Sequence, residues 1–182
     1  MASPNQIIIT FNENVLIQAD HLTVSSAVSG STYSFVGGTF NYDDNVKTAT
    51  WTFNTAFPAD QLVLTLDDAV TDRYGNALDG EWANPAALSS ASSDTWPSGN
   101  EVAGGDFIFR VTILPGDVNR DNVVNITDLN TTVNNSGLTP AIWTQGEMTG
   151  DNLVNLADKN LVSNNFARNF TTWPGGGMMM MS

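Results

Sequence analysis

Oxygen-bearing side chains recur at a regular spacing in residues 117–128. Asp, Asn, Asp, Asn and Asp occupy positions 1, 3, 5, 9 and 12 of this twelve-residue segment. A hard cation such as Ca²⁺ takes about six to eight oxygen ligands, and a loop with this spacing supplies most of them, with a backbone carbonyl at position 7. Mg²⁺ suits such a loop less well, because it demands a tight octahedron. The expected donors are Asp117, Asn119, Asp121, the Val123 carbonyl, Asn125 and Asp128.

A second segment repeats the pattern 30 residues later. Residues 146–158 align with residues 116–128 without a gap, and Asp, Asn, Val, Asn and Asp recur at five matched positions. Such a match indicates an internal duplication. Glu at position 1 and Thr at position 3 fit calcium less well, so we expect the second loop to bind it more weakly or to depend on the first. Its expected donors are Glu147, Thr149, Asp151, the Leu153 carbonyl, Asn155 and Asp158.

The competing interpretation is that both segments are solvated turns that bind no metal. The twelve-residue spacing, found twice, favours the metal interpretation, more strongly for the first loop than for the second. Position 6 of the first loop is Asn122, where such loops usually have Gly. Asn tolerates left-handed backbone better than other non-glycine residues do, so we expect Asn122 to adopt it.

Each loop leads into a segment whose apolar residues have helical spacing, with Ile126, Leu129 and Val133 in the first copy and Leu156, Val162 and Phe166 in the second. The chain before residue 114 has a different pattern. Short runs that are apolar or alternate apolar and polar residues predict β-strands, separated by turns rich in Gly, Asn and Asp. Such spacing favours an antiparallel sandwich. The expected strands are 6–11, 21–26, 32–36, 47–53, 61–66 and 106–113.

The two segments 116–137 and 146–167 together resemble a type I dockerin domain, a calcium-dependent module that binds cohesin domains. The resemblance rests on a twelve-residue calcium loop with Asp at position 12 and a helix after it, present twice. It implies an extracellular or cell-surface protein with a cohesin-like partner. In that family positions 10 and 11 contact the partner, and packing at the start of the helix is the alternative. Here these positions are Ile126, Thr127, Leu156 and Ala157.

Segments 8–15, 48–53, 64–66 and 70–80 resemble bacterial immunoglobulin-like modules of large surface proteins. The expected fold class is therefore a mainly β N-terminal Ig-like sandwich, residues 1–113, plus a small α-helical calcium-binding dockerin-like domain with paired loop–helix repeats, residues 114–174. Residues 175–182 are expected to form a flexible tail. Leu114, Pro115, Phe170 and Trp173 either close the two ends of the second domain, as in some dockerins, or belong to a frayed end.

Composition excludes several classes of function. The 182 residues carry a net charge of -13, and six basic residues spread singly form no face for nucleic acid. There is no Cys, the single His21 has no evident catalytic partner, and no glycine-rich phosphate loop is present, so we predict no enzyme activity. No apolar run approaches the roughly 20 residues of a membrane span. No signal peptide is visible either.

These patterns predict a non-catalytic, calcium-dependent protein–protein interaction module with an Ig-like spacer. The alternative is a structural unit of a surface layer or filament, in which neighbouring copies associate through exposed strand edges. A third hypothesis, carbohydrate binding, requires an exposed row of Trp51, Trp82 and Trp96. An acidic cluster with no recognisable ligand spacing is better interpreted as a solvated loop face than as another calcium site; its members are Asp67, Asp68, Asp72, Asp79 and Glu81.

Overall fold

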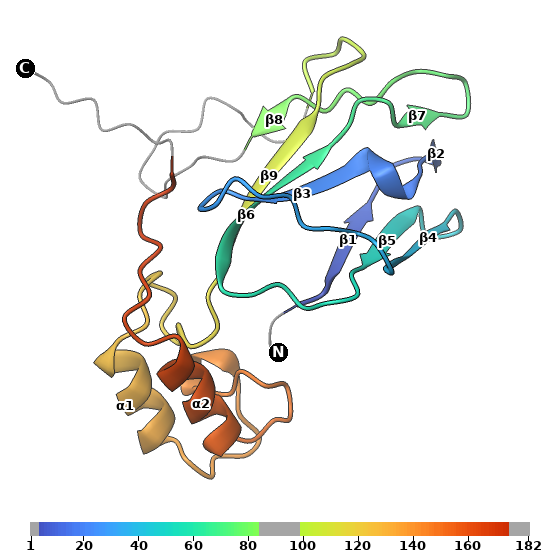
Figure 1. The fold of residues 1–182 in the computed structure, drawn as a ribbon. Coiled ribbons are helices and arrows are strands. Elements are labelled where there is room, and N and C mark those ends of the chain that lie inside the picture. The colour runs from blue at the N-terminus through green and yellow to red at the C-terminus, as the bar shows by residue number, and fades with distance from the viewer. Residues whose placement is uncertain (1–3, 84–98, 175–182) are drawn as a thin grey trace, which may run out of the picture. The chain divides into compact units, whose positions relative to one another are not determined.

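The computed structural model describes residues 4–83 and 99–174. They divide into two compact units, which we consider separately (Figure 1). The repeat unit contains residues 112–172 together with residue 4 and residues 57–60. The strand unit contains residues 5–56, 61–83, 99–111 and 173–174. The expected boundary after residue 113 lies close to the start of the main segment of the repeat unit, but no pattern in the sequence indicates that residues 57–60 belong to this unit.

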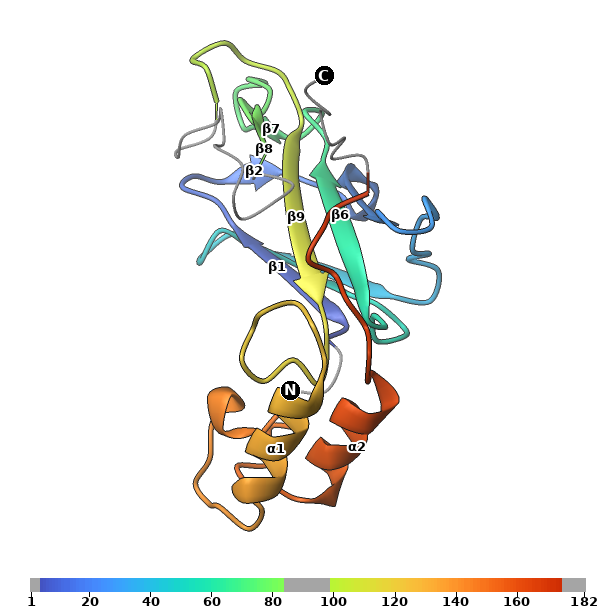
Figure 2. The same cartoon turned by 90° about the vertical axis from the view of Figure 1, so that its left-hand side faces the viewer.

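Three small sheets make up the β structure. The first has the order β1-β5-β4, with both pairings antiparallel, and consists of β1 (Gln6–Thr10), β5 (Thr48–Thr52) and β4 (Thr39–Asp43). The second pairs β2 (Val15–Leu16) with β7 (Thr71–Asp72). The third has the order β3-β6-β9-β8, and its strands are β3 (Leu22–Ser26), β6 (Asp60–Leu66), β9 (Phe107–Ile113) and β8 (Trp82–Ala83). Figure 2 shows the long strands β6 and β9 side by side.

The alternation expected in residues 47–53 is confirmed. Ala49, Trp51 and Phe53 are buried, and the threonines between them lie on the other face of β5. The Trp51 indole N–H donates to the carbonyl of Ala19 at 2.9 Å, which anchors the ring in the core. Because Trp51 is only 1% exposed, it cannot contribute to a carbohydrate-binding row, and Trp96 lies outside the described residues. The exposed row that the third hypothesis requires is therefore incomplete.

The expected strand at 32–36 is wrong, and β4 was missed. Thr32 forms a single bridge with Ser25, and the chain then turns instead of continuing as a strand. The Ser34 hydroxyl accepts the Val36 N–H at 3.2 Å, and Gly37 has a φ of 79°, so local hydrogen bonding competes with the sheet. The sequence pattern placed a strand where the serine and glycine make a turn.

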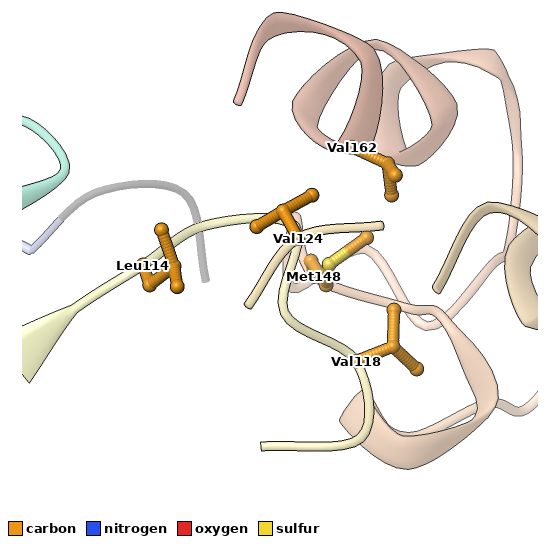
Figure 3. Close-up of a cluster of buried hydrophobic side chains, with 5 residues drawn as sticks. All are labelled: Leu114, Val118, Val124, Met148 and Val162. Atoms are coloured by element: carbon orange, nitrogen blue, oxygen red, sulfur yellow. The ribbon is translucent and has the colours of Figure 1, made fainter. Parts of the chain in front are cut away.

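Two short helices dominate the repeat unit, α1 (Ile126–Asn134) and α2 (Leu156–Asn164), with a 3₁₀ turn η2 (Trp143–Gln145) between them. Another 3₁₀ turn, η1 (Ala19–His21), lies in the strand unit. The two α-helices pack against each other and lie side by side in Figure 1. The helices expected after each loop are thus confirmed. Between them and the loops lies a small apolar core, drawn in Figure 3, of Leu114, Val118, Val124, Met148 and Val162.

The expected fold class was wrong. The described residues are mostly β, in three small sheets instead of one two-layer antiparallel sandwich, and β8 pairs with β9 in parallel. Two of the sheets contain strands of only two residues, because turns interrupt them. The helices have nine residues each, since an Asn cap begins each one and an Asn-rich turn ends it. Within the described residues, the repeat unit shows no sign of a dockerin-like helical calcium domain.

The described part of the chain has no helix that is long and apolar enough to cross a membrane.

Candidate metal-binding loops

The carboxylate at position 12 closes the first loop from within. Asp128 is fully buried, and its Oδ1 accepts the backbone N–H groups of Val118 at 2.8 Å and Asn119 at 3.3 Å. Its Oδ2 accepts the N–H of Asn125 at 2.9 Å. A buried carboxylate is stable only when its oxygens are bonded, so these three donors fix both the loop and the start of α1.

The second loop repeats this arrangement bond for bond. Asp158 is also fully buried, and its Oδ1 accepts the N–H groups of Met148 at 2.7 Å and Thr149 at 3.2 Å. Its Oδ2 accepts the N–H of Asn155 at 2.8 Å. Each of these contacts joins residues 30 positions beyond those in the first loop. The duplication inferred from the sequence therefore extends to the hydrogen bonds that set the conformation of the loops.

Position 1 differs between the loops. Asp117 uses both oxygens, Oδ1 for the Asp121 N–H at 3.1 Å and Oδ2 for the Asn122 N–H at 2.8 Å. Burial raises the pKa of the Asp117 carboxyl above its ordinary value, although hydrogen bonds from the loop backbone oppose the shift. A cation bound beside this carboxyl would favour its ionised form.

Glu147, at position 1 of the second loop, accepts through Oε1 alone. This oxygen receives the backbone N–H groups of Gly150 and Asp151, the latter at 3.2 Å, and the Thr149 hydroxyl at 3.1 Å. The extra methylene lets the side chain fold over the loop while a single oxygen takes all three bonds. Glu147 is therefore bonded differently from Asp117, and the expected weaker binding of calcium by the second loop stays a prediction.

Position 5 carries an exposed carboxylate in both loops. Asp121 Oδ1 accepts the Val123 N–H at 2.9 Å, and its Oδ2 accepts the side-chain amide of Asn119 at 2.9 Å. In the second loop, Asp151 Oδ2 instead accepts the side-chain amide of Asn155 at 2.8 Å. In each loop a neutral amide thus donates to an oxygen that the sequence assigns to calcium.

Two residues in each loop adopt left-handed backbone. At position 6, Asn122 has a φ of 65° and Asn152 a φ of 64°, as expected for an Asn in place of Gly. At position 4, Arg120 has a φ of 63° and Gly150 a φ of 85°. The backbone of the two loops is therefore left-handed at the same two positions.

The Asn at position 9 of each loop also begins the helix that follows. Asn125 and Asn155 are the N-caps of α1 and α2, and their side-chain oxygens accept the N–H groups of Thr127 at 2.7 Å and Ala157 at 2.6 Å. The signal was present, because Asn followed by an acidic residue three positions later is a capping box. These two donors of the expected calcium set are therefore held by the helices that follow them.

The donor set fits a hard cation in its chemistry, because every assigned atom is an oxygen and the acids at positions 1 and 12 are buried. The carboxylates of each loop are not drawn together, since their oxygens are bonded to backbone N–H groups. Among residues 4–83 and 99–174, three acidic groups come within 4.8 Å of one another only at Asp67, Asp68 and Asp106 in the strand unit. The assigned calcium ligands thus stay a prediction.

The acidic cluster of the strand unit is explained mostly by turns. Asp67 accepts the N–H of Ala69 at 2.7 Å, and Asp72 accepts from Asn76. Hydrogen bonds from Asn76 lower the pKa of Asp72. Asp106 Oδ1 in turn accepts the N–H of Asp68 at 3.2 Å. These bonds agree with a solvated loop face, and the cluster carries no metal assignment.

The four residues at positions 10 and 11 are all exposed. Ile126 is 56% exposed and Leu156 is 68% exposed, so a large apolar side chain is exposed at the equivalent place in each helix. Thr127 and Ala157 beside them are also exposed. Packing at the start of the helix does not account for them, so contact with a partner stays a prediction.

At the ends of the repeat unit, Phe170 packs against the cluster that contains Leu114.

A scan against protein-family models and a search of curated proteins found no match to this sequence.

Proposed function

We propose that this protein is a non-catalytic, calcium-dependent protein–protein interaction module of the extracellular space or cell surface. Each repeat loop holds one Ca²⁺, and the exposed first turns of α1 and α2 contact a partner protein. The partner class is the one that the sequence resemblance implies, a cohesin-like domain. The strand unit is the spacer of this arrangement.

The observation that carries the proposal is the matched closure of the two loops. Asp128 and Asp158 each accept three backbone N–H groups from equivalent positions of their loops, and the matched distances differ by no more than about 0.1 Å. Asn122 and Asn152 take the left-handed backbone that such loops require. Two segments with different side chains at positions 1, 3 and 4 share one conformation, which supports a common ligand. When bound, Ca²⁺ would neutralise the buried acids and fix the loop.

The charge distribution on the helices supports a protein partner. In a chain of net charge -13, the acids within α1 and α2 are Asp128 and Asp158, and both are fully buried. Lys159 is the one basic residue within these two helices. The exposed helix surface is therefore nearly uncharged, with Ile126 and Leu156 at its first turns. An uncharged surface with exposed apolar anchors is typical of protein interfaces.

The test is equilibrium binding to a purified cohesin-like domain, with saturating calcium and with chelator. We expect binding in calcium that is lost in chelator, and a loss of affinity of about tenfold or more for Ile126→Asp or Leu156→Asp. Val46→Asp is the matched control, because Val46 is 60% exposed but lies in a turn of the strand unit. Binding that chelator leaves unchanged, or no binding in calcium, contradicts the proposed partner.

One observation favours the alternative of self-association. Strand β1 is an edge of its sheet, and Ile8 on it is 59% exposed, so a second copy has an edge on which to add a strand. The net charge of -13 opposes it, since copies repel each other. Light scattering with and without calcium separates the two candidates, because only self-association predicts that the mass of the particle rises with calcium.

A further inference from the structure

The first loop is held by the tail that follows α2. The Val124 N–H donates to the Arg168 carbonyl at 3.0 Å, and the Ala167 N–H donates to the Val124 carbonyl at 2.8 Å. On the other side of position 7, the Phe170 N–H donates to the Asn122 carbonyl at 2.8 Å. Val123, whose carbonyl is the assigned ligand, is therefore fixed on both sides by the second repeat.

The second loop is held in the same way by the tail that follows α1. The Val154 N–H donates to the Leu138 carbonyl at 3.1 Å, and the Gly137 N–H donates to the Val154 carbonyl at 2.8 Å. The Ala141 N–H donates to the Asn152 carbonyl at 3.1 Å. These bonds lie on both sides of Leu153, the corresponding carbonyl ligand. Neither loop is thus complete within its own repeat.

The start of each loop also packs on the helix of the other repeat. A Cβ on Gly116 would lie 3.0 Å from the Cα of Val162 in α2, and a Cβ on Gly146 would lie 2.9 Å from the Cα of Thr132 in α1. Glycine at these places lets the backbone of one repeat approach that of the other. Figure 3 shows Val124 and Met148, one from each loop, with Val162 of α2 close by.

Because the tail of each repeat is hydrogen-bonded to the loop of the other, we propose that the two loops bind calcium with positive cooperativity. Each ion orders the opposite loop. The inference rests on the proposed function, because it requires that the loops bind calcium. An ion in the second loop fixes Asn155 and Asp158, and with them the start of α2. The helix carries its tail, residues 167–170, onto the first loop and holds the Val123 carbonyl in place for the second ion. The same sequence of contacts runs from the first loop through α1 to residues 137–141, as reciprocity between coupled sites requires.

The experiment compares calorimetric calcium titrations of the wild type, Asp121→Ala and Asp151→Ala. Each variant removes one exposed ligand and leaves the buried acids of both loops in place. We expect the overall two-ion association constant of the wild type to exceed the product of the two single-site constants at least about fivefold. Equality between the two overturns the coupling while leaving the calcium sites intact. No binding by the wild type contradicts the proposed function instead, so the two failures are distinguishable.

A second variant tests the tail itself. Phe170→Pro removes the N–H that donates to Asn122 without altering any assigned ligand, and Phe170→Leu keeps that N–H while losing the ring. Both are measured in the Asp151→Ala protein, in which only the first loop binds. We expect Phe170→Pro to weaken calcium binding about fivefold more than Phe170→Leu, with helical circular dichroism in calcium as the check on folding. Equal affinities for the two variants would overturn the role of the tail.

Discussion

The two loops of the repeat unit share a backbone conformation but differ in the side chains at positions 1 and 3. Asp117 divides its bonds between two oxygens, whereas Glu147 places three bonds on one. The amide that donates to the position 5 carboxylate comes from Asn119 in one loop and from Asn155 in the other. The residues that close the loops, at positions 6, 9 and 12, are identical. The shared conformation therefore goes with shared residues at positions 6, 9 and 12, and the two loops differ at positions 1 and 3.

The substitutions with the largest expected effect test whether the carboxylates at position 12 stabilise the two loops equally. Asp128→Ala and Asp158→Ala each leave three backbone N–H groups without their acceptor, so each should lower the free energy of unfolding of the repeat unit by about 3 kcal/mol or more. Urea unfolding in chelator, followed by far-ultraviolet circular dichroism, measures it. A loss below about 1 kcal/mol for either variant contradicts the equivalence of the two carboxylates.

The substitutions with the next largest expected effect test how tightly each loop packs against the helix of the other repeat. Gly116→Ala and Gly146→Ala each add a methyl group against backbone at 3.0 Å or less, at φ values of 105° and 96°. We expect each to destabilise the repeat unit by about 2 to 4 kcal/mol. Gly137→Ala is the matched control, because its φ is 89° but the space around it is open. If all three variants cost the same, the packing contributes nothing beyond backbone strain.

A reciprocal exchange at position 1 tests the difference in affinity. Glu147→Asp should raise the calcium affinity of the second loop on the order of tenfold, and Asp117→Glu should lower that of the first by a similar factor. The reason is that Asp presents both oxygens to the loop, whereas Glu reaches over it with one. Calorimetric titration in the presence of the opposite single-site knockout measures each change. If neither substitution changes the calcium affinity, the residue at position 1 does not cause the difference in affinity between the loops.

The smallest expected effect concerns position 4. Arg120 has left-handed backbone that its counterpart Gly150 adopts without strain, so Arg120→Gly should stabilise the repeat unit by about 1 kcal/mol. Gly150→Arg should destabilise it by about the same amount. Thermal unfolding in chelator compares the two variants. Changes of the same sign would show that the two loops are not conformationally equivalent at this position.

The local features of the repeat unit follow from the sequence because they are encoded by neighbouring residues. The spacing of oxygens predicted the loops, the Asn at position 6 predicted left-handed backbone, and the apolar positions predicted α1 and α2. The exchange of tails between repeats could not be predicted, since it depends on contacts such as Gly137 to Val154 between segments that are distant in sequence. Glycine at the same place in both repeats, residues 116 and 146, is a sequence signal of this close approach.

The fold class failed for a related reason. Alternating residues predict strands but not the order in which strands pair, so nothing in the sequence pattern separated one sandwich from three small sheets. Residues 32–36 have the alternation of a strand, and only the Ser34 hydroxyl and Gly37 decide for a turn. The short helices after each loop were taken for a helical domain, although they are a minor part of a mostly β chain.

A calorimetric titration of the wild-type protein with CaCl₂ tests most directly whether both loops bind calcium. We expect two ions for each chain, and one for each single-loop variant, Asp121→Ala or Asp151→Ala. We also expect that Mg²⁺ at the same concentration does not replace Ca²⁺. Absence of binding, or a stoichiometry that both substitutions leave unchanged, would contradict the assignment of the loops.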